Sequence, residues 1–168
     1  MSPTVRPLRD EERAWVRDFV RERWGDEIVV GHGVVFTPAT LPGLVLTDDA
    51  GGAVGLLTYV IEKDACEVVT IDAVVEGCGY GGLLIESVAH VAREAGCSLW
   101  LITTNDNVRA IGFYRAHGFE VVAIREDAIQ ESRRLKASIP LVNELGVPIR
   151  DEIEMERRLS FDAGNLPT

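Results

Sequence analysis

The chain has 168 residues, enough for one domain with a buried core, and its 46% hydrophobic and 26% charged residues are typical of a globular protein in water. The formal net charge of −10 argues against a nucleic-acid partner, because phosphate backbones select basic surfaces. The cysteines are widely spaced, which excludes a disulfide framework and a structural zinc site. No apolar run is long enough to span a membrane or resembles a signal sequence, so we expect a cytoplasmic protein.

The first part of the chain predicts a short strand at 4–8, a helix and a β-meander. Apolar residues at helical spacing between Asp10 and Trp24 indicate the helix. Residues 26–42, which contain Gly31-His32-Gly33 and two prolines, predict an irregular loop over a site or surface. Three strand-like runs separated by turn-like segments then predict the meander: Leu44–Thr47, Val54–Glu62 and Glu67–Val75.

The second part of the chain alternates helices and strands. A helix over 81–95 precedes an apolar strand over 97–103, and Asn105-Asp106-Asn107 supplies N-cap candidates for a helix that ends near His117. A strand over 119–125, a helix over 128–136, a loop over 140–148 and a last strand over 151–159 follow. We therefore expect a single α+β domain over residues 1–160, with a mixed sheet flanked by helices, and a flexible tail over 161–168.

The most informative segment joins a strand-like run to a helix-like run: Glu76-Gly77-Cys78-Gly79-Tyr80-Gly81-Gly82. Glycines permit positive φ and let a ligand come close to the backbone. The free N–H groups and positive dipole end of the following helix can hold a phosphate group without a lysine. The segment therefore predicts a phosphate-binding loop.

The spacing Gly77-x-Gly79-x-x-Gly82 also matches the fingerprint of dinucleotide-binding domains. That fingerprint normally stands near the start of its domain, whereas here residues 1–75, which end in a meander, precede the loop. Too few strand–helix units follow to build two mononucleotide-binding halves. We therefore reject a dinucleotide-binding domain.

A second segment, Asn107-x-x-Ala110-x-x-Phe113-Tyr114-x-x-x-Gly118-Phe119, follows the glycine loop. Together the two motifs resemble the GNAT superfamily of acetyl-CoA-dependent N-acetyltransferases. The resemblance implies an acyl-CoA N-acyltransferase fold with a central mixed sheet of six or seven strands. It also implies that the amides of residues 77–82 bind the coenzyme A pyrophosphate, and that the pantetheine arm lies between the splayed strands 68–75 and 97–103.

Coenzyme A would be the co-substrate, as acetyl-CoA, and no metal is expected. The CoA-binding residues implied by the resemblance are Val74, Val75, Gly77, Cys78, Gly79, Tyr80, Gly81, Gly82, Asn107, Ala110, Phe113 and Tyr114. Glu76 departs from the family, which favours Arg or Gln at that position, and its charge is expected to repel phosphate unless the side chain turns away. Arg109 is either a phosphate ligand or an exposed helix residue.

Tyr114 matches the family's general acid, which protonates the departing thiolate, although it could also bind the thiol side without proton transfer. For the base that deprotonates the amine, Glu67 matches the strand position of a glutamate used by some members. Asp72, which strict strand alternation places on the opposite face from Glu67, and a chain of water molecules are the alternatives. Cys78 is interpreted as filling the loop rather than as a nucleophile, and the scattered His32, His90 and His117 receive no metal or catalytic role.

The function implied is direct transfer of an acetyl group from acetyl-CoA to a primary amine in a ternary complex. The acceptor is expected to be a small-molecule or peptidyl amine, and residues 26–42 and 128–150 are expected to shape its pocket. The acidic net charge favours a cationic acceptor. The sequence does not decide between a monomer and a homodimer. The alternative function is a non-catalytic acyl-CoA sensor or interaction module on the same fold.

Overall fold

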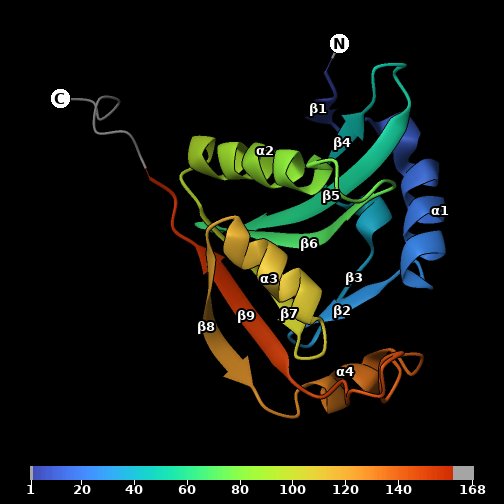
Figure 1. Ribbon diagram of the computed structural model, residues 1–168, viewed down its shortest axis with the longest axis vertical. Helices are drawn as coiled ribbons and strands as arrows, with labels where there is room; N and C mark the ends of the chain where they lie inside the picture. Colours follow the sequence, from blue (N-terminus) through green and yellow to red (C-terminus); the bar gives the residue numbers. More distant parts are fainter. Residues whose placement is uncertain (1, 161–168) are drawn as a thin grey trace.

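A seven-stranded sheet organises the chain in the computed structural model, which describes residues 2–160 (Figure 1). Its strand order is β1-β4-β5-β6-β7-β9-β8. The bounds of these strands are Thr4–Pro7 (β1), Gly43–Thr47 (β4), Ala53–Glu62 (β5), Ala65–Ala73 (β6), Ser98–Thr104 (β7), Phe119–Arg125 (β8) and Glu152–Arg157 (β9). All neighbours are antiparallel except β6 and β7, so the predicted mixed sheet flanked by helices is confirmed.

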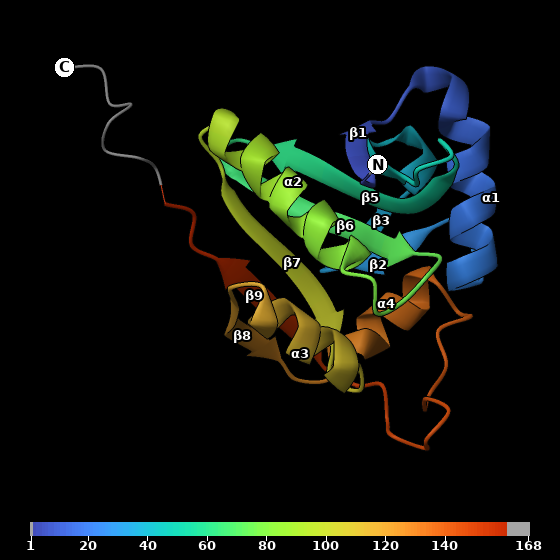
Figure 2. The same ribbon diagram turned by 45° about the horizontal axis from the view of Figure 1, so that its top comes forward.

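Four α-helices accompany the sheet within the described residues: Arg13–Trp24 (α1), Tyr80–Glu94 (α2), Val108–Ala116 (α3) and Ile129–Leu135 (α4). Figure 2 shows α2 and α3 lying side by side across one face of the sheet. The apolar stripe of α2 is fully buried there against strands β4 to β7 and β9, and Phe113 and Tyr114 of α3 border the same cluster. No helix within residues 2–160 combines the length and apolarity needed to cross a membrane.

Helix α1 covers the opposite face of the sheet. Its residues Val16, Phe19 and Val20 are buried with Leu56 of β5, whereas the neighbouring Leu57 belongs to the cluster under α2. Successive side chains of a strand point to opposite faces, so these two leucines separate the two cores. The sheet is therefore covered on both faces.

The parallel strands β6 and β7 pair only at their beginnings. Their register runs from Ala65 opposite Ser98 to Val68 opposite Leu101, and no further pair is formed within the described residues. From Val69 to Ala73 the β7-facing edge of β6 is consequently unpaired. The predicted splay between these strands is present, and it opens the middle of the sheet.

A β-bulge in β6 changes which side chains share a face. The pairing with β5 goes from Tyr59 opposite Val68 to Thr58 opposite Thr70, so Val69 is an extra residue. Strict alternation would place Glu67 and Asp72 on opposite faces, but the bulge turns both toward the face that carries α1. The prediction of opposite faces was therefore wrong.

Residues 26–42 are more regular than the predicted irregular loop. They contain a β-hairpin of β2 (Val29–Gly31) and β3 (Val34–Phe36), followed by a short 3-10 turn over Pro38–Thr40. His32 at the hairpin tip has φ of 40° and Gly33 has φ of 79°, which makes the two-residue turn tight. The insertion after β8 contains α4 as predicted and an isolated bridge between Val142 and Pro148. The predicted tail, 161–168, lies outside the described residues.

Candidate active site

The loop between β6 and α2 has the backbone conformation that the glycine pattern predicted. Gly77 and Gly79 adopt φ of 79° and 77°, and a Cβ added at either position would meet no atom within 4 Å. Gly79 is the N-cap of α2, so the unpaired N–H groups of the first helical turn face the open side of this loop. The two glycines allow a tight turn beside an unobstructed approach to the helix N-terminus.

The next two glycines, Gly81 and Gly82, lie where helices α2 and α3 pack against each other. A Cβ on Gly81 would stand 2.8 Å from Cζ of Phe113, and a Cβ on Gly82 would stand 2.8 Å from Nε2 of His117. Both contacts are shorter than van der Waals distance, so Gly81 and Gly82 allow α2 and α3 to pack closely. The last glycine of the fingerprint therefore acts in helix packing.

A cleft of about 520 Å³ lies between the loop, α2 and α3. It brings together all the residues for which the sequence predicted CoA binding except Val74 and Cys78. Both exceptions lie in the loop, and Val74 and Val75 follow the end of β6 rather than belonging to it. Arg109, for which a phosphate contact was left open, also lines the cleft. The other lining residues were not predicted to bind CoA: Ile71, Asp72, Ala73, Glu76 and His117.

Glu76, the residue that departs from the family pattern, forms an ion pair across the mouth of the cleft. Its Oε2 accepts a hydrogen bond of 2.7 Å from Nη2 of Arg109 on α3, and both side chains are exposed. The Arg109 guanidinium offsets the carboxylate charge locally, although solvent makes such a surface pair weak. The side chain thus turns toward α3, which reduces the expected repulsion of phosphate.

Tyr114 stands where the cleft reaches the splay between β6 and β7. Burial, assisted by the negative charge of Asp72, raises the pKa of the Tyr114 phenol to about 12. No hydrogen bond to its hydroxyl is made by residues 2–160, although its ring packs edge-on against Phe113 and Phe119. A protonated, unpartnered phenol therefore lines the cleft.

A second cavity, of about 170 Å³, lies between the splayed strands, the β2–β3 hairpin and α4. Val29, Val30 and Phe36 come from the hairpin, and Ile129 comes from the insertion. Three residues line both this cavity and the cleft: Ile71, Asn107 and Tyr114. The two spaces consequently meet at the Tyr114 ring, in the gap left by the interrupted pairing.

Glu67 and His32 form the main polar contact beside the second cavity. Nε2 of His32 lies 3.0 Å and 2.9 Å from the two carboxylate oxygens of Glu67, which is only 8% exposed. This contact raises the pKa of the His32 imidazole, against the effect of burial. No catalytic or metal role was predicted for His32, because its partner Glu67 lies 35 positions further along the chain and nothing local marks the pair.

Asp72 has a structural partner instead. Its Oδ2 lies 2.7 Å from Nε of Arg23 at the end of α1, and its Oδ1 accepts the N–H of Ala73 at 2.8 Å. Nη2 of Arg23 also donates to the carbonyl of Ala73. The carboxylate therefore ties α1 to the end of β6.

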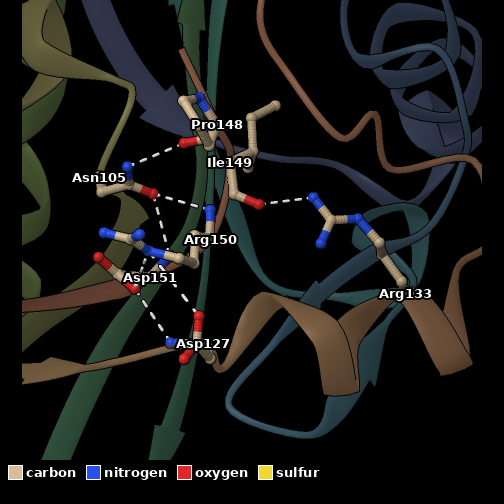
Figure 3. A network of polar contacts seen from close by, with 7 residues as sticks. All are labelled: Asn105, Asp127, Arg133, Pro148, Ile149, Arg150 and Asp151. Atoms are coloured by element: carbon tan, nitrogen blue, oxygen red, sulfur yellow. Dashed lines mark hydrogen bonds and ion pairs between the residues drawn. The ribbon is translucent and has the colours of Figure 1, made fainter.

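Asn105 fastens the insertion to the loop before α3 (Figure 3). Its Nδ2 donates to the carbonyl of Pro148, and its Oδ1 accepts the N–H groups of Arg150 and Asp151, each at 2.9 Å. Arg133 of α4 donates to the carbonyl of Ile149 from the other side. Lys136 also donates to the carbonyl of Ile28, so the insertion is joined to the β2–β3 hairpin.

Asn107 occupies the N-cap position of α3, but its side chain makes no capping hydrogen bond. Its Nδ2 instead donates to Oγ1 of Thr103 at 3.4 Å. The predicted N-cap position of Asn107 is confirmed, although its side chain does not cap the helix. Asn107 lines both cavities and therefore lies at their junction.

The fold, the glycine loop and the paired cavities define an acyltransferase framework. A family model described as the acetyltransferase (GNAT) family matches residues 7–119. The chain therefore belongs to the GNAT acetyltransferase family, which confirms the resemblance inferred from the two motifs.

Relatives and solved structures agree with this membership. The Bacillus subtilis (strain 168) protein YdhI, itself uncharacterised, is 37% identical over 149 residues, which cover 88% of this chain and 92% of that protein. The ribosomal-protein-S18-alanine N-acetyltransferase of Escherichia coli superposes with a TM-score of 0.67 at 18% identity, covering 99% of both chains. A GNAT family acetyltransferase from Elizabethkingia anophelis, solved with acetyl-CoA bound, gives a TM-score of 0.69 at 16% identity, covering 94% of this chain and 99% of that one.

Proposed function

We propose that the protein transfers the acetyl group of acetyl-CoA to a primary amine by direct attack in a ternary complex. The observation that carries this proposal is the meeting of the cleft and the second cavity at Tyr114. A thioester in the cleft and an amine in the second cavity would reach one another through the gap between β6 and β7. Family membership supports the acyl transfer, and the meeting of two spaces favours two substrates over a sensor of one.

The cleft suits coenzyme A for two reasons. The N–H groups at the start of α2 can receive the pyrophosphate, because they have no helical partners and carry the positive end of the helix dipole. The unpaired edge of β6 from Val69 to Ala73 can receive the amide groups of the pantetheine arm, as a further strand would. The acetyl-CoA bound to the Elizabethkingia protein of the same fold supports this cofactor.

Tyr114 would act on the departing sulfur. With a pKa of about 12 its phenol keeps the proton at neutral pH, so it can donate a hydrogen bond to the developing thiolate. Full transfer to a thiolate whose acid has a pKa of about 8.5 would cost about 5 kcal/mol. Hydrogen-bond donation therefore supplies the larger share of the effect, while the carbon–sulfur bond breaks and the carbon–nitrogen bond forms.

Glu67 would accept the proton of the attacking amine. It lines the second cavity, and His32 contacts both oxygens of its carboxylate. An alkyl amine with a pKa near 10 is almost wholly protonated at neutral pH, so a carboxylate at the entry to the reaction centre is useful. Asp72 is less suited because it does not line the second cavity and because the permanently charged Arg23 pairs with its carboxylate.

Thiol release from acetyl-CoA in the presence of a panel of primary amines tests the proposal. We expect turnover with at least one amine, and a fall in kcat of about 10- to 100-fold in Tyr114→Phe, because the phenol donates in the transition state. Calorimetric titration with CoA serves as the control, and it should show similar affinity in both proteins. Binding of CoA without turnover of any amine would instead favour the sensor.

A further inference from the structure

The second cavity has two acidic residues in its lining, together with the polar Thr103, Thr104, Asn107 and Tyr114. Glu67 and Glu152 are the acidic residues that line it, and no lysine or arginine from residues 2–160 does so. The remaining wall is formed largely by aliphatic and aromatic side chains of the hairpin, the splayed strands and α4. A ligand in this space therefore meets two carboxylates and no described cationic side chain.

Glu152 differs from Glu67 in forming no ion pair within residues 2–160, although its charge contributes to raising the pKa values of His32 and Arg125. It is 2% exposed, and its Oε2 accepts the backbone N–H of His32 at 2.8 Å. Its register partner on β8, Arg125, directs its guanidinium to Glu154 at 2.9 Å. No described residue donates to the other oxygen, Oε1, of Glu152.

Oε1 of Glu152 is not fully buried. Within residues 2–160 no fully buried side-chain nitrogen or oxygen lacks a hydrogen-bond partner, so Oε1, which has none there, keeps some accessible surface, and Glu152 lines the second cavity. A carboxylate enclosed in this way is costly unless a cation or donor accompanies it. Glu67 differs in this respect, because the His32 imidazole can neutralise it.

The acidic character continues along β9. Glu154 and Glu156 follow Glu152 at every second position and so occupy the same face of the strand. Only Glu154 of these three has an ion-pair partner among the described residues. A positively charged ligand is thus attracted to this face, and a carboxylate-bearing ligand is repelled.

We propose that the acceptor is a small linear amine with a second ammonium group, an inference that rests on the proposed acetyl transfer. The second ammonium group binds Glu152, while the reacting amine faces Glu67 and the thioester. The small volume and largely apolar wall of the cavity suit an unbranched alkyl linker. A carboxylate in place of the second ammonium group would face Glu152 without a counter-ion. Glu152 is in this view the residue that selects the acceptor.

Three acceptors of equal chain length test the inference: 1,4-diaminobutane, 1-aminobutane and 4-aminobutanoate. We expect kcat/KM for the diamine to exceed that for the monoamine by about tenfold or more, and 4-aminobutanoate to be the poorest. In Glu152→Gln, which keeps an oxygen to accept the His32 N–H, the ratio of diamine to monoamine should fall to about two, the value expected from the two equivalent amino groups of the diamine. Glu62→Gln, an exposed site outside the cavity lining, removes the same charge and should keep the wild-type ratio.

The wild-type ratio needs no variant, so misfolding of Glu152→Gln cannot hide the answer. A wild-type ratio of diamine to monoamine of about two or less would overturn the inference and leave the proposed acetyl transfer standing. A preference for the diamine well above about twofold that persists in a folded Glu152→Gln protein would overturn the role of Glu152. Absence of turnover with all three acceptors and the wider amine panel would overturn the proposed function, and this inference with it.

Discussion

Among single residues, His32 links the protonation of the candidate site to stability. Because Glu67 raises the pKa of His32, this contact contributes stability that is complete below about pH 6.5 and is lost as pH rises through the raised value. Glu152 acts in the same direction and Arg125 in the opposite one. We therefore expect wild-type protein to be more stable than His32→Gln near pH 6, by about 1 kcal/mol, and the difference to shrink by pH 9.

Urea unfolding of both proteins at the two pH values measures this difference. Titration of the histidine ring signals by NMR gives a direct check, because the pKa of His32 should fall in Glu67→Gln. His90→Gln is the matched control, since His90 is exposed on α2, and its stability relative to wild type should not follow the same curve. An unchanged His32 pKa in Glu67→Gln would contradict the pairing.

The fate of single predicted residues shows what local sequence can and cannot specify. That Tyr114 and the glycine loop border one cleft could be predicted, because their spacing along the chain matches two family motifs. The contact of His32 with Glu67 could not, since it joins positions separated by 35 residues and depends on a hairpin turn. The face of the sheet on which Asp72 lies was predicted wrongly, because the sequence pattern of β6 does not reveal that Val69 is an extra residue in the strand.

At the scale of elements, two glycine substitutions in the adjacent helices α2 and α3 should have opposite effects on the stability of the fold. Gly81→Ala places a methyl group 2.8 Å from Phe113 and should destabilise the fold by about 1 to 3 kcal/mol. Gly112→Ala, within α3 and with no atom near its added Cβ, should stabilise the fold by about 0.5 to 1 kcal/mol. Urea unfolding distinguishes the two signs, and stabilisation by Gly81→Ala would show that the helices have room to separate.

The Asn105 side chain makes three hydrogen bonds to the insertion, so two substitutions at this residue should lower the stability to different degrees. Asn105→Ala removes three hydrogen bonds to the 148–151 segment and should cost about 1 to 3 kcal/mol. Asn105→Asp keeps the acceptor for Arg150 and Asp151 and loses the donor to Pro148, so it should cost less. Amide hydrogen exchange at residues 150 and 151 should accelerate in the alanine variant, whereas equal protection in both variants would contradict this attachment.

The elements themselves were predictable to different degrees. The helices and long strands of the sheet carry their own periodicity, so their existence followed from the sequence. The β2–β3 hairpin did not, because its strands are three residues each and too short for an alternation to register. The splay of β6 from β7 was expected from the family resemblance alone, since backbone pairing ends there without a local sequence signal.

For the whole molecule, the net charge of −10 opposes the approach of coenzyme A, whose phosphates are negatively charged. The cleft must therefore attract the phosphates by short-range contacts with loop amides, while the distant charges repel them. Salt shortens the reach of that repulsion from about 30 Å at 10 mM to about 8 Å at 150 mM ionic strength. We expect the dissociation constant of CoA to fall by about two- to fivefold over this range.

A cationic acceptor should respond in the opposite direction, because the same salt weakens its attraction to Glu152 and the acidic face of β9. The KM for 1,4-diaminobutane should thus rise with ionic strength, while the KM for the monoamine should rise less. Calorimetric titration of CoA and acceptor kinetics at matched NaCl concentrations measure the two trends. Weaker CoA binding at higher salt would show that the Arg109 guanidinium outweighs the net charge, because local attraction would then be the interaction that salt screens.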